Sequence, residues 1–218
     1  MGMLVPLSYD GSVQRKFAAG DILCGFDPIP PATDATVNLS YTAAMVLTPN
    51  YVRNPGAASL DTFPTADALI SQLSTGLGTQ PGVPLGLSFR WKIINLAASL
   101  ITGQVNANTG ATLVRGNVAA SITKDFLVTI TNGTPLQSVT NLNTVNGSAV
   151  VTGFSAVQIA AISVGQVILN AVANLQGQLV TAVNATALSV TLSAVANVTA
   201  VGNTLTFSPT YTLTGLAV

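Results

Sequence analysis

The sequence predicts a mainly β protein, with an antiparallel sandwich or jelly-roll-like body, one short helix, an extended N-terminal arm and a C-terminal β module. Short apolar runs alternate with polar residues, as in LSVTL at residues 188–192, which is typical of half-buried strands. Asparagine and glycine separate these runs at even spacing, as turns do in sandwiches and barrels. Helical spacing of apolar residues occurs near residues 65–73.

The chain has few charged residues for its length. They make up 6% of its 218 residues, against a usual share of about 25%. Seven basic and seven acidic side chains cancel, so the net charge favours neither nucleic acid nor a membrane as a partner. Weakly charged surfaces tend to associate. We therefore expect partner chains to cover much of this surface, the alternative being a chain that aggregates.

Residues 1–45 are expected to form an extended docking arm. Asp10-Gly11 predicts a tight turn, and the proline cluster at residues 28–31 predicts a stiff, extended segment. Cys24 is the single cysteine, so the chain has no disulfide of its own, and a small buried side chain is the favoured role of Cys24. An arm of this kind can add strands to an exposed sheet edge.

Residues 46–140 are expected to form the body, with its one helix early in the segment. The residues that indicate this helix are Thr65 as N-cap, Asp67 in the first turn, Ala66, Leu69, Ile70 and Leu73 on the apolar face, and Gly76 and Gly78 at the end. Glycine-punctuated apolar runs after the helix predict short strands. The runs are residues 88–95, 100–101, 111–114, 118–122 and 126–131.

Residues 88–95 alternate strongly between two faces. Phe89, Trp91 and Ile93 share one face, whereas Arg90 and Lys92 lie on the other. One interpretation is a basic and aromatic stripe that binds single-stranded nucleic acid, and the other is a core strand with cations on its solvent side. We favour the core strand, because two cations are few and the aromatic side chains point away from them.

Residues 141–218 are expected to form a separate β module. From residue 126 to residue 218 there is no Asp, Glu, Lys, Arg, His or Cys. This segment therefore lacks a general base, a thiolate and ordinary metal ligands. Gln and Asn interrupt its most apolar stretch, residues 154–175, so no membrane-spanning helix is expected there. We interpret the module as an assembly element that acts by shape, packing and backbone hydrogen bonds.

Little in the sequence supports an enzyme, because histidine and glutamate are both absent. The available carboxylates are Asp10, Asp21, Asp27, Asp34, Asp61, Asp67 and Asp125. Most of them lie beside glycine or proline or near a helix start, where aspartate serves as a turn or cap residue. We therefore predict no catalytic residue, no cofactor and no metal site. Hydrolysis by a pair of these carboxylates is the enzymatic alternative.

A glycan-binding adhesin is a further alternative, because β-sandwiches often bind sugars through aromatic side chains. The aromatic candidates are Tyr41, Tyr51, Trp91 and Tyr211. They are too scattered in the sequence to define a binding platform. A place in the core or at a subunit interface is the favoured role of each.

Three stretches of the chain resemble parts of bacteriophage virion proteins. The first, residues 6–23, resembles the opening of small phage structural and fibre proteins, and it matches at Gly11, Gln14, Gly20, Asp21 and Leu23. The second, residues 54–140, resembles a virion module in which a helix precedes several strands. Its matching residues are Asp61, Pro64, Thr65, Ala66, Gly86, Ser88, Phe89, Trp91 in place of a more usual Phe or Tyr, Ile93, Asn95, Gly110, Thr112, Leu113, Phe126, Val128, Thr131 and Asn132.

The third stretch, residues 143–207, resembles a repeat appended to phage tail, fibre and head-decorating proteins. The matching segments are residues 146–148 (NGS), 151–153 (VTG), 163–167 (SVGQV), 180–183, 189–193 (SVTLS) and 205–207 (LTF). Residues 170–177 depart from the glycine-rich pattern of the repeat. No ligand is therefore assigned to that loop.

The resemblance implies a virion structural protein that is assembled in the host cytoplasm. We expect a capsid-decorating, or cement, subunit that forms a homotrimer and contacts the major capsid protein or another virion protein through its arm. A cement subunit is favoured over a fibre, because the chain is short and has no coiled-coil heptads or shaft repeat. The alternative is a tail or head fibre or adhesin subunit that contacts the host surface.

Overall fold

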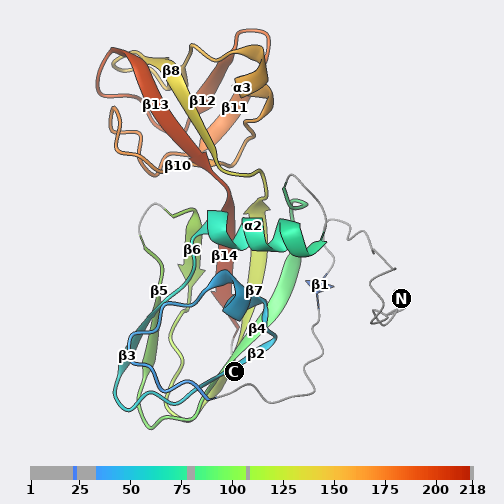
Figure 1. The fold of residues 1–218 in the computed structure, drawn as a ribbon. Helices are drawn as coiled ribbons and strands as arrows, with labels where there is room; N and C mark the ends of the chain where they lie inside the picture. Colours follow the sequence, from blue (N-terminus) through green and yellow to red (C-terminus); the bar gives the residue numbers. More distant parts are fainter. Residues whose placement is uncertain (1–21, 24–32, 78–81, 107–108, 217–218) are drawn as a thin grey trace.

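The structure, a computed structural model, describes residues 22–23, 33–77, 82–106 and 109–216. The chain forms two β-rich lobes that lie end to end (Figure 1). The larger lobe, which we call the body, contains the described residues before Gly133 and the final strand. The smaller lobe, which we call the barrel, is formed by residues 135–208. The expected turn at Asp10-Gly11, the proline cluster and Cys24 lie outside the described residues.

The body is built on one six-stranded sheet of order β1-β4-β7-β14-β6, with β2 also paired to β4. Its strands are β1 (Ile22–Leu23), β2 (Asn50–Arg53), β4 (Ser88–Asn95), β6 (Ala111–Val114), β7 (Thr123–Asn132) and β14 (Thr210–Gly215). A separate pair is formed by β3 (Ser59–Thr62) and β5 (Ile101–Gln104). The body also contains helices α1 (Ala43–Leu47) and α2 (Ala66–Leu77).

Strand pairing in the body is mixed rather than wholly antiparallel. β4, β7 and β14 are antiparallel neighbours. The pairs β1–β4, β2–β4, β3–β5 and β6–β14 are parallel. Parallel neighbours need long connections, and the described chain supplies them: α2 lies between β2 and β4, and the whole barrel lies between β6 and β14.

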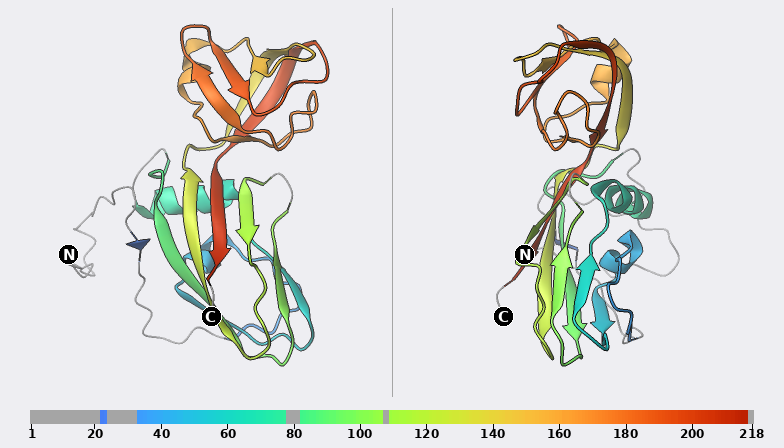
Figure 2. Two further views of the ribbon diagram at one scale, coloured as in Figure 1. Left: turned by 180° about the vertical axis from the view of Figure 1, so that it is seen from behind. Right: turned by 90° about the vertical axis from the view of Figure 1, so that its left-hand side faces the viewer.

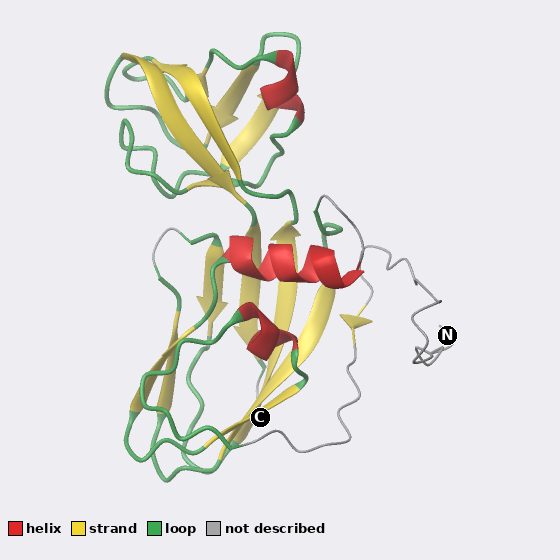
Figure 3. Ribbon diagram, viewed as in Figure 1, coloured by secondary structure: helices red, strands yellow, loops and turns green. Residues whose placement is uncertain are grey.

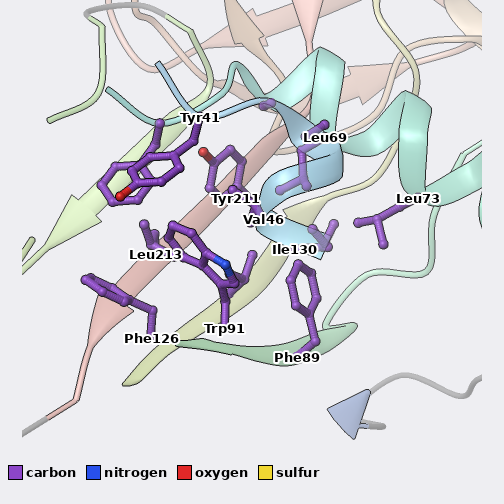
Figure 4. Close-up of a cluster of buried hydrophobic side chains, with 14 of the residues drawn as sticks. Tyr41, Val46, Leu69, Leu73, Phe89, Trp91, Phe126, Ile130, Tyr211 and Leu213 are labelled. Atoms are coloured by element: carbon purple, nitrogen blue, oxygen red, sulfur yellow. The ribbon is translucent and has the colours of Figure 1, made fainter. Parts of the chain in front are cut away.

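One face of the main sheet is covered by α1, α2 and the β3–β5 pair, and the body core lies between these layers (Figures 2 and 3). Trp91 is fully buried at its centre, as expected for the inward face of β4. The Trp91 ring lies 5.0 Å from Tyr41, 5.7 Å from Phe63 and 5.8 Å from Phe126, measured between ring centroids (Figure 4). Edge and tilted contacts of this kind stabilise aromatic cores.

The expected helix is confirmed as α2. The hydroxyl of Thr65 accepts a hydrogen bond from the backbone N–H of Ala68 (3.2 Å), as an N-cap does. Ala66, Leu69, Ile70 and Leu73 are buried against the sheet. The expectation of a single helix is wrong, because α1 and α3 (Ala156–Ala160) also form. Each has only five residues, held by a capping box at Thr42 or Ser155, and such short segments carry no readable periodicity.

The strands expected at residues 88–95 and 111–114 form with these bounds. The strand expected at residues 118–122 is wrong, because only Val118 pairs, in an isolated bridge to Ile101. The side-chain amide of Asn95 donates hydrogen bonds to the carbonyls of Ser99 (2.9 Å) and Ala119 (2.8 Å). These bonds hold the chain after Val118 in a turn instead of an extended ladder.

The barrel contains two three-stranded antiparallel sheets of order β10-β13-β8 and β11-β12-β9. Its strands are β8 (Gln137–Thr144), β9 (Val150–Val151), β10 (Val167–Ile168), β11 (Val180–Asn184), β12 (Ser189–Leu192) and β13 (Ala200–Ser208). Isolated bridges from Asn143 to Thr152 and from Val167 to Leu179 join the two sheets at both sides. The ring of strands is therefore closed around its own core, which includes Phe154 and Phe207.

The barrel is inserted between β7 and β14. β13 continues into β14 with only Pro209 between them, and β14 then lies between β7 and β6 in the body sheet. The expected module at residues 141–218 therefore differs from the structure at both ends, because β8 begins at Gln137 and β14 belongs to the body. The expected arm at residues 1–45 also differs, because Leu39, Tyr41 and Ala43 are buried in the body core.

Candidate functional site

Two carboxylates of the body, Asp34 and Asp61, surround one buried arginine, Arg53. Arg53 is 0% exposed at the end of β2, and the Nε and Nη2 atoms donate to both carboxylate oxygens of Asp61 on β3 (2.9 and 3.0 Å). Its Nη1 donates to the backbone carbonyl of Asp34 (3.0 Å), and its Nη2 to that of Thr36 (2.6 Å). Paired charges with satisfied hydrogen bonds are the form in which proteins bury ions. The network ties residues 34–36 to the body.

Three further hydrogen bonds to the carboxylate of Asp61 complete this network. Asp61 accepts hydrogen bonds from the hydroxyl of Tyr41 (2.8 Å), the hydroxyl of Ser59 and the backbone N–H of Leu39 (3.2 Å). Burial alone would lower the pKa of Arg53, but the hydrogen bonds and charge of Asp61 outweigh it and raise the pKa. The arginine therefore stays charged, and its donors are used inside the fold.

The carboxylates considered for catalysis do not come together as an accessible pair. Asp34 and Asp61 are both bound to Arg53, Asp67 lies in the first turn of α2, and Asp125 lies 3.8 Å from Lys92 on the sheet. Asp10, Asp21 and Asp27 lie outside the described residues. Across the described ranges, no three His, Cys, Asp or Glu side chains are grouped closely enough to hold a metal ion.

The aromatic residues considered for glycan binding lie in the core instead. Tyr41, Trp91 and Tyr211 are at most 3% exposed, and Tyr51 packs edge-on against Tyr41 with 5.4 Å between ring centroids. The hydroxyl of Tyr211 donates to the backbone carbonyl of Pro64 (2.7 Å). The structure thus gathers residues that are scattered in the sequence, but it places them inside the body, where they form no platform for a sugar.

Two buried tyrosines, Tyr41 and Tyr211, and the partly buried Tyr51 predict a loss of stability at alkaline pH. Burial, with the charge and hydrogen bond of Asp61, raises the pKa of Tyr41 above its usual value, and burial also raises the pKa of Tyr211. Burial and the hydrogen bond to Asp34 raise the pKa of Tyr51 to about 12. Folding favours each neutral phenol, so its contribution is complete below about pH 10 and is lost as pH rises through the folded pKa.

A spectroscopic titration checks this prediction. Phenolate absorbance of these tyrosines is expected to rise well above pH 10 and together with the red shift of Trp91 emission that marks unfolding. Ionisation of all four tyrosines of the chain near pH 10, with unchanged Trp91 emission, would contradict it.

Hydrogen bonds of polar side chains connect the two lobes at their junction. Asn132, at the end of β7, donates to the hydroxyl of Ser163 and to the carbonyl of Val164 (both 2.8 Å). The hydroxyl of Thr210 in β14 likewise donates to the carbonyl of Gly165 in the barrel (3.1 Å), and within the barrel the buried amide of Gln166 donates to the carbonyl of Pro135 (3.3 Å). The sequence segment SVGQV at residues 163–167 therefore packs the barrel onto the body.

A pocket of about 480 Å³ lies at the same junction and has no charged lining residue. Its lining includes Val83 and Leu85 from the body and Ile162 and Val164 from the barrel. The side-chain amide of Asn132 lines the pocket, but both of its polar atoms already have partners at the junction. Its Nδ2 donates to the barrel, and its Oδ1 accepts from the backbone N–H of Thr134 (2.9 Å). The pocket thus offers apolar surface without titratable chemistry.

Exposed valines gather at the end of the barrel farthest from the body. β8 runs away from the body to Thr144 and β13 returns from Ala200, so the segments 145–148 and 195–201 meet at this end (Figure 1). The backbone N–H of Gly147 donates to the carbonyl of Ala196 (2.8 Å), which holds the two segments together. We call Val145, Val195, Val198 and Val201 the distal tip. They are 54%, 51%, 45% and 81% exposed.

The distal tip belongs to a lobe without ionisable side chains, because residues 126–218 contain none. Exposed apolar groups on such a lobe are the usual mark of a binding surface. Sequence reasoning identified the uncharged segment but not these four valines, because their exposure depends on how the barrel closes. It also did not single out Arg53. The one sequence signal of Arg53 was an arginine directly after Tyr51-Val52, at the end of β2.

Comparisons with models of protein families, with curated proteins and with solved structures found no significant match to this chain. Within the described ranges, no helix has the length and apolar character that a membrane crossing requires. The uncharged barrel and its distal tip are the candidate functional site, because they combine exposed valines with a segment that has no ionisable side chain. Their chemistry is that of a contact surface.

Proposed function

We propose that this chain is a bacteriophage virion structural protein, a capsid-decorating or cement subunit that forms a homotrimer and stabilises the particle. The observation that carries the proposal is a complete folded lobe without one ionisable side chain and with exposed valines at its tip. Surface charge normally keeps lobes apart in solution. A lobe that lacks it favours lasting contact with other uncharged surface.

The proposed partner of the barrel is the barrel of a second copy. A partner with ordinary charged residues would leave them buried and unpaired against the barrel, which costs free energy. Another barrel brings no charge to the contact. The sandwich or jelly-roll-like arrangement of the body belongs to the same proposal, and the packing of the β3–β5 pair and both helices over the main sheet supports it.

The arm at residues 1–45 is proposed to contact the major capsid protein or another virion protein. β1 supports this role, because its backbone pairs with Ser88 and Phe89 at the edge of β4. Pairing at a sheet edge is the contact by which an extended arm binds a neighbouring subunit. Assembly in the host cytoplasm and a place in the virion follow from the same proposal.

Mixing the purified chain with shells that lack it, and separately with host cell envelope, tests the proposal. A cement subunit is expected to bind the shells, to raise the temperature at which they fall apart and to leave the envelope unbound. Binding to envelope without binding to shells would replace the proposal with the fibre or adhesin alternative.

Substitution of Val201 by aspartate is expected to weaken self-association about tenfold or more, because it buries an unpaired charge between barrels. Val201 is 81% exposed in the single chain, so the fold should lose about 1 kcal/mol at most. The matched control is Val157→Asp, since Val157 is 82% exposed but lies in α3, outside the segments 145–148 and 195–201 that form the distal tip. Sedimentation or light scattering over a dilution series measures both. If Val201→Asp and Val157→Asp self-associate equally strongly, the contact between copies does not lie at the distal tip.

A further inference from the structure

Asparagine followed by glycine occurs twice in the sequence, as Asn132-Gly133 and as Asn146-Gly147. Asparagine is a thermolabile residue, and a following glycine favours loss of its amide, because glycine has no Cβ to keep its backbone nitrogen away from the asparagine side chain. The two pairs lie in different surroundings. Asn132 lies at the junction of the lobes, whereas Asn146 directly follows Val145 of the distal tip.

The side chain of Asn132 is held in one position. It is 4% exposed, and its Nδ2 donates to the hydroxyl of Ser163 and to the carbonyl of Val164 (both 2.8 Å). Its Oδ1 accepts from the backbone N–H of Thr134 (2.9 Å). Rotation of this amide toward the next backbone nitrogen would break these bonds in buried surroundings, which costs free energy. The fold therefore protects Asn132.

The side chain of Asn146 has no such restraint. It is exposed, and within the described residues its side-chain amide forms no hydrogen bond, although its backbone N–H donates to the hydroxyl of Thr199 (2.9 Å). Gly147 lies in the same exposed turn with φ 78°. Its backbone N–H donates to the carbonyl of Ala196 (2.8 Å), and this bond opposes a reaction of the nitrogen. The net strength of one such bond slows the reaction roughly fivefold and does not prevent it.

Deamidation at Asn146 proceeds in two balanced steps. The backbone nitrogen of Gly147 attacks Cγ of Asn146, the new C–N bond closes a cyclic imide, and the Cγ–Nδ2 bond breaks as ammonia leaves with the backbone proton. Water then opens the imide at either carbonyl. One opening leaves an aspartate side chain, and the other leaves isoaspartate, in which the main chain passes through Cγ. Both products carry a carboxyl group, which is ionised at neutral pH.

The position of Asn146 gives this carboxylate a large effect. Residues 126–218 contain no ionisable side chain, so the carboxylate would be the first charge of the barrel. It would lie beside Val145, in the turn that the bond from Gly147 to Ala196 joins to the rest of the distal tip. A charge that is buried without a partner between apolar surfaces costs free energy. The isoaspartate product also lengthens the main chain within this turn.

We infer that Asn146 is a site of spontaneous deamidation, and that the reaction charges the distal tip and ends its binding to other copies. The effect on assembly rests on the proposed function, whereas the reaction itself does not. Contact between copies at the distal tip excludes water and restricts the turn, so assembly before the reaction protects Asn146. A chain that stays unassembled loses its capacity to assemble with time.

Peptide mapping of the aged full-length chain tests the reaction. The chain is incubated in dilute solution at mildly alkaline pH, once folded and once in guanidinium chloride. It is then digested with thermolysin, because residues 126–218 contain no lysine or arginine for trypsin. Mass spectrometry measures the replacement of the amide by a carboxyl group at each asparagine.

The folded chain is expected to react at Asn146 about tenfold faster than at Asn132, or more, because the bonds of Asn132 must break first. The unfolded chain should react at similar rates at both positions. An Asn146 that keeps its amide in the folded chain but loses it in the unfolded chain would overturn the inference. Faster reaction at Asn132 in the folded chain would overturn it as well.

The variants Asn146→Asp and Asn146→Ser test the effect on assembly. Aspartate supplies the charge of the product, serine removes the reactive amide without adding charge, and both residues are common in turns. Light scattering over a dilution series should show self-association of Asn146→Asp weakened about tenfold or more. Asn146→Ser should associate like the fresh wild type, and so should Val157→Asp, which adds the same charge outside the distal tip. Association of Asn146→Asp as strong as that of Asn146→Ser would overturn the inferred switch.

The two measurements separate the inference from the proposed function. A chain that self-associates and binds shells but keeps the amide of Asn146 on ageing would leave the cement role intact and overturn the inference. Deamidation at Asn146 in a chain that has the single-chain mass at every concentration would support the modification site and overturn the proposed contact between barrels.

Discussion

Substitution of Asp61 by asparagine is expected to lower the free energy of unfolding by about 3–5 kcal/mol. Asp61 and Arg53 are both fully buried, and both carboxylate oxygens of Asp61 accept from the guanidinium group. Asparagine keeps the size of the side chain but removes its charge and one acceptor. Arg53 is then left with Asp34, which is 3.3 Å away and partly exposed. The cost is that of an under-compensated buried cation.

Urea unfolding followed by the emission of Trp91 measures this loss, because the one tryptophan of the chain lies at the centre of the body core. The matched control is Asp67→Asn in the first turn of α2, where loss of the charge costs about 1 kcal/mol or less. Equal effects of the two substitutions would mean that the buried network contributes no more than a surface charge.

A chain that ends at Ser208 is expected to lose the folded body and to keep the folded barrel. The truncation removes β14, which lies between β7 and β6 and buries Tyr211 and Leu213 in the body core. Loss of a central strand exceeds the roughly 5–15 kcal/mol by which a domain is stable. The barrel keeps all six of its strands and its closing bridges.

Trp91 emission and proteolysis together measure this outcome. The truncated chain should show the emission of a solvated tryptophan. It should also leave a resistant fragment of about residues 135–208 after digestion with thermolysin, which cuts beside apolar residues. Trypsin is uninformative for the barrel, because that lobe contains no lysine or arginine. The control ends at Leu216 and keeps β14. A truncated chain with buried Trp91 would contradict the insertion of the barrel into the body.

The sequence predicts local features of this fold well. The alternation of residues 88–95 identified β4 and its buried face, because side chains along a strand point to two sides in turn. The spacing around Leu69 and Ile70 identified α2 and its cap for a similar reason. Both signals lie within one element, so neither depends on where the rest of the chain lies.

Features that join distant segments could not be predicted in this way. The parallel pairing of β6 with β14 brings together residues about a hundred positions apart. β14 follows β13 after a single proline, so its sequence reads as part of the C-terminal module although it lies in the body. The network of Arg53 likewise joins Asp34 and Asp61 from separate segments, and no local pattern marks such a meeting.

The candidate site was predictable in its chemistry but not in its shape. The sequence alone shows that no ionisable residue follows Asp125, and this absence predicts an assembly surface. The distal tip is different, since Val201 is exposed whereas Val190 is buried, and both lie in strands of similar composition. Only the closure of the barrel decides which valines face inward.

The native mass of the purified full-length chain, measured by light scattering over a range of concentrations, tests the central claim most directly. A chain that assembles through its uncharged barrel is expected to have three times the 22.1 kDa mass of a single chain. The Val201→Asp variant should move toward the single-chain mass at the same concentration. A wild-type chain that stays at 22.1 kDa at every concentration would contradict the claim that other copies of the chain bind the uncharged barrel.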